Sequence, residues 1–302
     1  MARSDLQPPT VAAAVTDAAE RLRSAGVPTP RLDAELLVAH LFDRERTWLH
    51  AHPEVAVAPD DAALLDGWVA RRGAGEPVAY IRGYKEWFSL RVATDRRALI
   101  PRPETELLAE AAIAEIAARL VRDHEPIVAW DVATGSGAVA LALALRFRTA
   151  LRLGRLRLVA SDVSPDALEL ASENLAVHGV SGVVSLAGGD LLEPVSELSV
   201  VPDVLSANLP YVRSDEVERA EGSLAYEPRA ALDGGPDGLD VVRRLVAQLP
   251  ERLAAASVAL LEVGAGQAEA TRALVAALPM RSVVTILPDL AGIDRVVRVA
   301  RL

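Results

Sequence analysis

The amino-acid sequence predicts an α/β protein in which a small N-terminal helical bundle and a linking β-hairpin precede a parallel sheet. Three observations predict this class. Apolar residues recur at helical spacing through the first 75 residues, aromatic and β-branched residues gather in residues 76–100, and short apolar strands alternate with helices after Pro101. Such alternation is typical of a parallel sheet that helices cover on both faces.

Three helices are expected in the first domain, residues 1–75. One covers residues 10–25, and a second begins at Thr29-Pro30, where a capping residue precedes a proline at the first helical position. The third follows Pro59. Each helix carries a row of leucine, valine or alanine side chains on one face, so the three can bury a common core.

The second domain is expected to cover residues 101–302, after a hairpin linker at residues 76–100. Its strands are predicted at residues 127–132, 156–162, 183–187, 203–208, 257–263 and 283–287, with a last strand near 295–299. Its first helices are predicted at residues 104–122, 139–147 and 165–177. Ligands of such sheets bind beyond the carboxyl ends of the strands, where the strand order reverses, so the residues that follow the strands are the candidates for a site.

Composition excludes several classes of function. The chain has no cysteine, which excludes disulfides, thiolate nucleophiles and cysteine-ligated metals, and its histidines are too scattered for a metal site. The net charge of -10 counts against a stable complex with nucleic acid, because such complexes need a basic surface. The longest apolar run, residues 138–145, is far too short to cross a membrane, so we expect a cytoplasmic protein.

The loop after the first strand of the sheet, Asp131 to Gly137, is predicted to bind a cofactor. Gly135 and Gly137 let the backbone turn tightly and approach a ligand, and the helix that follows offers free N–H groups. The loop does not match the dinucleotide pattern, since Ala140 stands where a third glycine would be, and it lacks the lysine of a P-loop. The carboxylate of Asp131 suits a ligand with a positive amino group, such as the methionine part of S-adenosylmethionine.

Two more aspartates follow the next two strands. Asp162 ends the second strand, where a carboxylate can accept hydrogen bonds from ribose hydroxyls. Asp190 follows the third strand, beside Leu191, where it can meet an adenine amino group. Each aspartate alone is more often a turn or cap residue. Three of them at the ends of consecutive strands, after a glycine loop, predict a nucleoside cofactor.

The fourth strand ends in Asn208-Leu209-Pro210-Tyr211, a motif suited to methylation of a planar nitrogen. An amide nitrogen is a poor nucleophile because its lone pair is delocalised into the carbonyl. The Asn208 side-chain oxygen can accept one N–H of such a group and the Leu209 carbonyl the other, while Pro210 restrains Leu209 to an extended conformation. Tyr211 can stack on the flat acceptor. The chemistry then depends on positioning and electrostatics, without an acid-base pair.

Further motifs occur along nearly the whole chain. They comprise the linker Leu99-Ile100-Pro101-Arg102-Pro103-Glu104-Thr105-Glu106, residues 75–83 before it, and residues 227–229, 231–235, 238–240, 261–264 and 289–292 after it. In these motifs the sequence resembles the HemK-type release-factor glutamine N(5)-methyltransferases. The linker motif is the specific part, since the glycine loop and Asn-x-Pro-Tyr are shared with many nitrogen methyltransferases.

The resemblance implies a class I (Rossmann-like) S-adenosylmethionine methyltransferase fold. Residues 1–75 would then be a helical substrate-docking domain, residues 76–100 a β-hairpin linker and residues 101–302 the catalytic domain. The implied acceptor is the glutamine in the Gly-Gly-Gln motif of peptide-chain release factors, where methylation aids termination. Release factors would be the partners, with no stable nucleic acid and no membrane. The sequence leaves the oligomeric state open and favours a monomer.

Carried over residue by residue, the resemblance implies cofactor contacts from Ala133, Thr134, Gly135, Ser136, Gly137, Asp162 and Asn208. The candidates Asp131, Asp190 and Leu191 complete the predicted cofactor site. The substrate glutamine would be held by Asn208, Leu209, Pro210 and Tyr211. Two residues depart from the family pattern: Ala133 stands for the first glycine of the loop, and Leu209 for the first proline of Asn-Pro-Pro-Tyr. We expect activity to survive both.

Other functions are compatible with parts of the sequence. Asn-Leu-Pro-Tyr also occurs in ribosomal RNA adenine dimethyltransferases, so an adenine N6-methyltransferase acting on nucleic acid is the main alternative. A methyltransferase for a ribosomal-protein glutamine and a catalytically silent cofactor-binding protein are two others. The sequence also leaves open whether Glu262, at a strand end over the site, touches the substrate or only caps the sheet.

Overall fold

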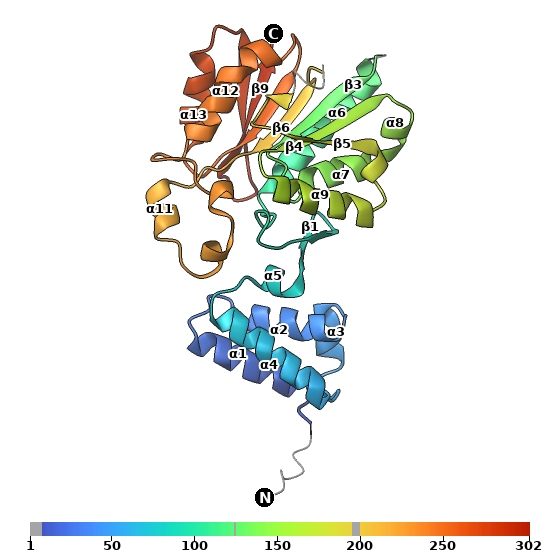
Figure 1. Ribbon diagram of the computed structural model, residues 1–302, viewed down its shortest axis with the longest axis vertical. Coiled ribbons are helices and arrows are strands. Elements are labelled where there is room, and N and C mark those ends of the chain that lie inside the picture. The colour runs from blue at the N-terminus through green and yellow to red at the C-terminus, as the bar shows by residue number, and fades with distance from the viewer. Residues whose placement is uncertain (1–7, 124, 195–199) are drawn as a thin grey trace, which may run out of the picture. The chain divides into compact units, whose positions relative to one another are not determined.

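The protein folds into two compact units in the computed structural model, which describes residues 8–123, 125–194 and 200–302 (Figure 1). The first unit comprises residues 1–83 and a later segment, residues 220–226. The second comprises residues 84–219 and 227–302. The segment 220–226 therefore belongs to the helical unit, although the chain on both sides of it belongs to the second unit.

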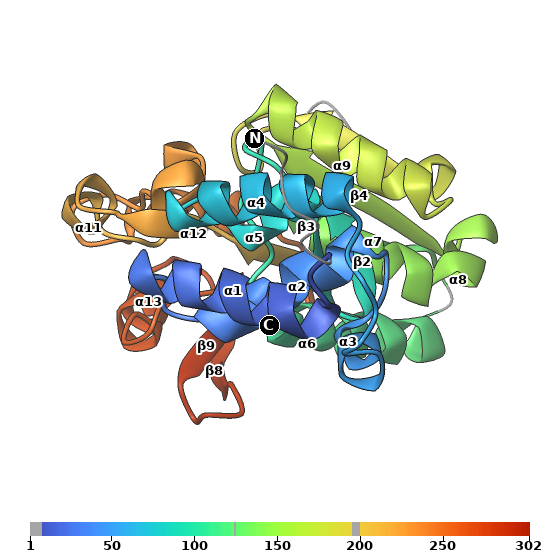
Figure 2. The same cartoon turned by 90° about the horizontal axis from the view of Figure 1, so that it is seen from below.

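The first unit is a bundle of helices. They are α1 (Val11–Ser24), α2 (Pro30–Leu41), α3 (Arg46–Ala51), α4 (Pro59–Gly73) and α5 (Val78–Arg82). Helix α1 begins where the Thr10 hydroxyl accepts a hydrogen bond from the Ala13 N–H, and α2 and α4 begin at a proline, which preorganises the first turn. Figure 2 shows α1, α2 and α4 side by side, and their buried apolar side chains form one core.

One ion pair is buried inside this bundle. The Arg72 Nε lies 2.7 Å from Asp33 Oδ2, and both side chains are less than a tenth exposed. The same guanidinium reaches Ser223 Oγ at 3.4 Å, and the Tyr226 hydroxyl donates to the Ala74 carbonyl at 3.2 Å. These contacts attach the segment 220–226 to α4 and the turn after it.

The hairpin is shorter than residues 76–100, the range predicted from the sequence. Residues 78–82 form helix α5, which ends at Gly83, and only β1 (Tyr84–Trp87) and β2 (Leu90–Ala93) pair in antiparallel fashion. The prediction rests partly on aromatic residues in this range, and one of them, Trp87, has a packing role. Its side chain is buried, and its indole N–H donates to the Arg102 carbonyl at 2.8 Å.

The second unit is built on a seven-stranded sheet with the order β5-β4-β3-β6-β7-β9-β8. Its strands are β3 (Ile127–Val132), β4 (Leu156–Asp162), β5 (Val184–Gly188), β6 (Val204–Asn208), β7 (Val258–Glu262), β8 (Ser282–Pro288) and β9 (Asp294–Arg301). Strand β9 runs antiparallel to both neighbours, while the remaining pairs are parallel. The predicted α/β class is confirmed, and β9 corrects the expectation of a wholly parallel sheet.

Helices cover both faces of this sheet (Figure 1). They are α6 (Thr105–Arg122), α7 (Ala138–Arg146), α8 (Arg148–Arg152), α9 (Pro165–Val177), α12 (Asp240–Arg252) and α13 (Ala268–Ala276). A further short helix, α11 (Ser214–Glu218), lies in the segment after β6, away from the sheet (Figure 1). Side chains alternate between the two faces along a strand, so in β3 the neighbours Ala129 and Trp130 belong to separate apolar cores. Within the described residues, no helix is both long and apolar enough to span a bilayer.

The strand order reverses between β3 and β6. From β3 the chain proceeds to β4 and then β5 on one side, and it later continues with β6 and β7 on the other. The loops after β3 and β6 therefore diverge and leave a crevice at the carboxyl edge of the sheet, the position at which ligands of open α/β sheets bind.

Candidate functional site

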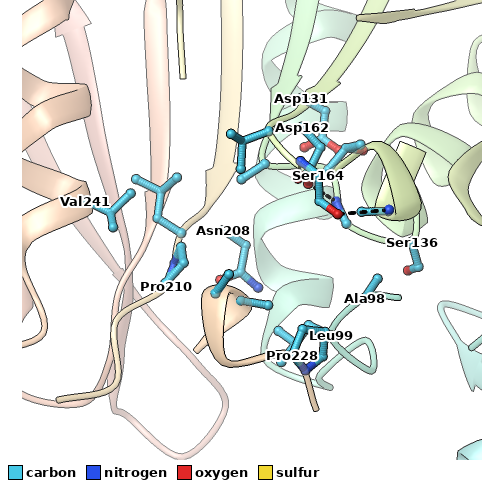
Figure 3. Close-up of a pocket in the computed structure, with 18 of the residues that line it drawn as sticks. Ala98, Leu99, Asp131, Ser136, Asp162, Ser164, Asn208, Pro210, Pro228 and Val241 are labelled. Atoms are coloured by element: carbon cyan, nitrogen blue, oxygen red, sulfur yellow. Dashed lines mark hydrogen bonds between the residues drawn. The ribbon is translucent and has the colours of Figure 1, made fainter. Parts of the chain in front are cut away.

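A cavity of about 260 Å³ occupies this position in the second unit. Figure 3 shows Asp131 and Asp162 at one end, Asn208 in the middle, and Leu99 and Pro228 at the far side. The structure brings most of the predicted residues into its wall: Asp131, Ala133, Thr134, Gly135, Ser136, Asp162, Asp190, Leu191, Asn208, Leu209 and Pro210. Gly137 and Tyr211 lie outside this wall.

Asp131 presents a buried carboxylate to the cavity. Its oxygens accept hydrogen bonds from the Thr134 hydroxyl at 2.6 Å and the Ser206 hydroxyl at 2.8 Å. No described basic side chain forms an ion pair with it, and burial raises its pKa to about 6. A buried carboxylate with two neutral donors and no cation is a site for a positively charged ligand group, such as an ammonium.

The glycine loop takes its shape from Asp162. One carboxylate oxygen of Asp162 accepts the Gly135 N–H at 2.8 Å, and the other accepts the Ser164 N–H at 2.9 Å, at the start of α9. Burial raises the pKa of this carboxyl, while these backbone donors oppose the shift. Asp162 therefore fixes the loop and also lines the cavity.

Ala133 and Gly137 play different parts in the loop. Ala133 has a φ of 55°, in the left-handed region where a Cβ is unfavourable by about 1 kcal/mol. Gly137 has a φ of 77°, and a Cβ on it would lie 2.9 Å from the Cβ of Ala171 in α9. The structure therefore assigns Gly137 to the contact between α7 and α9.

Asp190 and Leu191 close the cavity after β5. The Asp190 carboxylate pairs with Arg244 of α12, and both residues line the wall. Sequence reasoning missed Arg244, because an arginine on the polar face of an amphipathic helix carries no motif of its own. Leu191 has a φ of 51° and is buried, so its side chain gives the wall an apolar surface beside that ion pair.

Glu227 joins two segments of the wall, and its role was also missed. Its buried carboxylate accepts the Ile100 N–H at 3.0 Å and pairs with Arg102 at 2.6 Å. The linker residues before Thr105 and the residues after Glu227 both line the cavity. The signal was present in the linker motif and in Glu227-Pro228-Arg229, but nothing in the sequence shows that the two motifs meet.

Asn208 is the last residue of β6 and faces the middle of the cavity (Figure 3). Its side-chain Nδ2 donates to the Thr105 hydroxyl oxygen at 3.0 Å. Among the described residues, nothing donates to its Oδ1 or to the carbonyl of Leu209. The cavity wall thus holds two neighbouring acceptors that protein donors leave open.

Tyr211 is held behind this pair. Its carbonyl accepts a hydrogen bond from the Gln267 side-chain nitrogen at 3.0 Å, and a Cβ on Gly264 would lie 3.2 Å from its ring. Burial, together with the negative charge of Glu262, raises the pKa of the Tyr211 hydroxyl to about 12. The tyrosine is therefore neutral, and the stacking role predicted for its ring stays a prediction.

Comparisons with known proteins identify relatives over nearly the whole chain. Residues 13–83 match the family described as the PrmC N-terminal domain. The chain is 37% identical to the release factor glutamine methyltransferase of Moorella thermoacetica, over 95% of this chain and 96% of that protein. It is 36% identical to the protein of the same name from Koribacter versatilis, over 95% and 97%.

A solved structure shares the fold. The catalytic domain of hMettl16, in complex with the MAT2A 3'UTR hairpin 6, aligns with a TM-score of 0.53 at 12% identity, over 80% of this chain and 82% of that one. At this identity the likeness concerns the fold alone. The identities of 36 to 37% along almost the full length show more: this chain belongs to the family of release factor glutamine methyltransferases.

Proposed function

We propose that this protein transfers a methyl group from S-adenosylmethionine to the side-chain amide nitrogen of the glutamine in the Gly-Gly-Gln motif of peptide-chain release factors. The observation that carries the proposal is the pair of open acceptors, Asn208 Oδ1 and the Leu209 carbonyl, in the same cavity as the cation-free carboxylate of Asp131. The first two match an amide NH₂, and the third matches the ammonium of the cofactor.

The residues of the cavity fit this cofactor. Asp131 would hold its ammonium, Asp162 its ribose hydroxyls, and the ion-paired Asp190 with apolar Leu191 its adenine. S-adenosylmethionine supplies an electrophilic methyl group when bound. Ala133 lines the same wall, and its backbone already adopts the left-handed conformation that glycine favours.

The acceptor end supplies orientation. With one N–H of the glutamine on Asn208 Oδ1 and the other on the Leu209 carbonyl, the plane of the amide is fixed and its nitrogen faces the methyl group. Both hydrogen bonds place negative oxygens beside protons that become more acidic as the nitrogen–carbon bond forms, so they stabilise the transition state. One proton then leaves to solvent, and the other remains on the methylated amide.

The helical unit is proposed to dock the release factor, since beside the cofactor the cavity would admit only the reacting side chain of that protein. The predicted boundary between the helical docking domain and the hairpin linker, at residue 75, stays a prediction. The compact helical unit of the structure extends through α5 to Gly83. Because release factors act on ribosomes, we place the reaction in the cytoplasm.

The test uses labelled S-adenosylmethionine with an unmodified release factor, beside a copy whose Gly-Gly-Gln glutamine is changed to alanine. Label on the first alone is expected. Label on both, or on ribosomal RNA supplied in a parallel reaction, would contradict the proposal, and label on RNA alone would support the adenine N6-methyltransferase instead.

A further inference from the structure

Glu262 is a buried acid that the proposed reaction does not use. It is the last residue of β7 and lies in register with Asn208 at the end of β6, so both residues emerge at the same edge of the sheet. Its side chain is 1% exposed and does not line the cavity. Neither carboxyl oxygen has a well-formed hydrogen bond within the described residues. Buried polar atoms without partners are rare in proteins, and each calls for a reason.

The group that approaches Glu262 is Thr105, at the start of α6. The Thr105 hydroxyl favours the charged form of the acid, although burial prevails and raises its pKa to about 7. The basic side chains of this region are engaged elsewhere: Arg102 pairs with Glu227, and Arg295 with Asp289. The Thr105 hydroxyl is therefore the donor available to Glu262, and the same hydroxyl accepts the hydrogen bond from Asn208.

The orientation of the Asn208 amide decides whether the cavity can hold a glutamine. With Nδ2 on Thr105, Oδ1 faces the acceptor NH₂. With the amide turned over, Asn208 would present its own NH₂ to the substrate NH₂, and two donors would face each other. A threonine hydroxyl cannot choose between the two states, because it accepts from a nitrogen and donates to an oxygen equally well.

We propose that Glu262 makes this choice: by accepting the hydrogen bond that the Thr105 hydroxyl donates, it leaves that hydroxyl only its lone pairs for Asn208, which turns Oδ1 toward the substrate. Glu262 and Thr105 are thus positioning residues for Asn208. This inference rests on the proposed function for its substrate. A carboxyl group keeps an acceptor oxygen whether it is ionised or protonated, so the arrangement works in both states.

The test compares variants that keep the shape of the site. Glu262→Gln is isosteric but can donate as well as accept, and Thr105→Val removes the hydroxyl. We expect kcat with the release factor to fall about 3- to 10-fold in the first and about 10- to 100-fold in the second, through misorientation of Asn208. The cofactor Kd, measured by calorimetry, is expected to change less than about twofold.

Three variants separate positioning from general damage. Thr105→Ser restores a hydroxyl and should recover most of the kcat lost in Thr105→Val. Thr271→Val is the matched control, because Thr271 is fully buried in α13 with no described partner for its hydroxyl, and kcat should stay at the wild-type value. In the double variant Thr105→Val/Glu262→Gln, kcat should equal that of Thr105→Val alone, since Glu262 acts through Thr105. If the fold-losses of kcat in the two single variants multiply in the double variant, the inference would be overturned.

A second measurement needs no substrate. Hydrogen exchange of the Asn208 Nδ2 protons, followed by NMR, should be slow in the wild type and at least about tenfold faster in Glu262→Gln, because the amide then samples both orientations. Unchanged exchange would overturn the inference even if release factors are methylated. Absence of methylation by the wild type, with exchange as expected, would instead overturn the substrate assignment.

Discussion

The two ends of the cavity treat their polar groups in opposite ways. At the cofactor end, Asp131, Asp162 and Asp190 are each held by donors from the protein. At the acceptor end, Asn208 Oδ1 and the Leu209 carbonyl have no described donor, and behind them Glu262 has no well-formed hydrogen bond. Under the proposed function, the difference means that the polar groups of the cofactor end are held by the protein itself, whereas those of the acceptor end would gain their partners from the substrate. We therefore expect substitutions at the acceptor end to lower mainly kcat, and substitutions at the cofactor end to weaken mainly cofactor binding.

The largest expected effect is at the acceptor end. Asn208→Ala removes an acceptor that orients the nitrogen in the transition state, so kcat with the release factor should fall by about 10² to 10³. The melting temperature should fall by no more than about 4 °C, because Asn208 gives up only one hydrogen bond to Thr105. Single-turnover kinetics with labelled cofactor measure the first quantity and calorimetry the second. Loss of stability in parallel with activity would remove the contrast between the two ends.

Asp131→Asn is expected to weaken the binding of the cofactor. The neutral amide no longer balances a bound ammonium, and we expect the Kd for S-adenosylmethionine to rise about 10- to 100-fold, with kcat at saturating cofactor less affected. Isothermal titration provides the Kd. An equal fall in kcat at saturation would show that the two ends act as one.

The same residue predicts a pH dependence. Burial raises the pKa of Asp131 to about 6, so the carboxylate is ionised at pH 7 and becomes protonated as the pH falls through 6. The wild-type Kd should therefore increase below pH 6, by up to about tenfold per pH unit, as the counter-charge for the ammonium is lost. In Asp131→Asn this dependence should be absent. A flat profile in the wild type would mean that Asp131 does not face the charged group.

Glu227→Gln tests whether Glu227 stabilises the fold of the cavity wall rather than the binding of the cofactor. The amide can still accept the Ile100 N–H but leaves the Arg102 guanidinium, which is 29% exposed, without its charge partner. We expect the free energy of unfolding of the catalytic unit to fall by about 1 to 2 kcal/mol, measured by urea denaturation. Cofactor affinity should fall by less than about threefold, a smaller loss than in Asp131→Asn.

The smallest effect is expected at Ala133. Glycine relieves the left-handed strain at a φ of 55° but increases the entropy of the unfolded chain, so Ala133→Gly should change stability by no more than about 1 kcal/mol. Cofactor affinity should change less than twofold. A large gain in affinity would show that the Cβ of Ala133 obstructs the cofactor, contrary to our expectation that activity survives this departure from the family pattern.

The strands were predictable because their signal is local. The ranges predicted at residues 127–132 and 156–162 coincide with β3 and β4, since each is an apolar, β-branched run bounded by turn residues. Helices α3 and α5 were not predicted, because elements of five or six residues show less than two turns of periodicity. The direction of β9 depends on which strand it meets, a fact that no local pattern contains.

The site shows the same limit. Residues at strand ends, such as Asp131, Asp162 and Asn208, could be placed together from the alternation of strands and helices alone. Arg244, Glu227 and Thr105 could not, because each meets its partner from 54 to 127 positions away in the chain. Gly137 is predicted from its loop to contact the cofactor, which stays a prediction, while its closeness to Ala171 shows a packing requirement that the sequence does not reveal.

The segment 220–226 makes the helical unit discontinuous in the sequence. The chain passes from one unit to the other at residues 83–84, 219–220 and 226–227, so no single cut separates them. A polypeptide that starts at residue 84 would carry Ser223 and Tyr226 without Arg72 and the Ala74 carbonyl, their partners in the helical unit. The residues of the two units therefore alternate along the sequence. An exchange of the N-terminal part between relatives would have to exchange residues 220–226 as well.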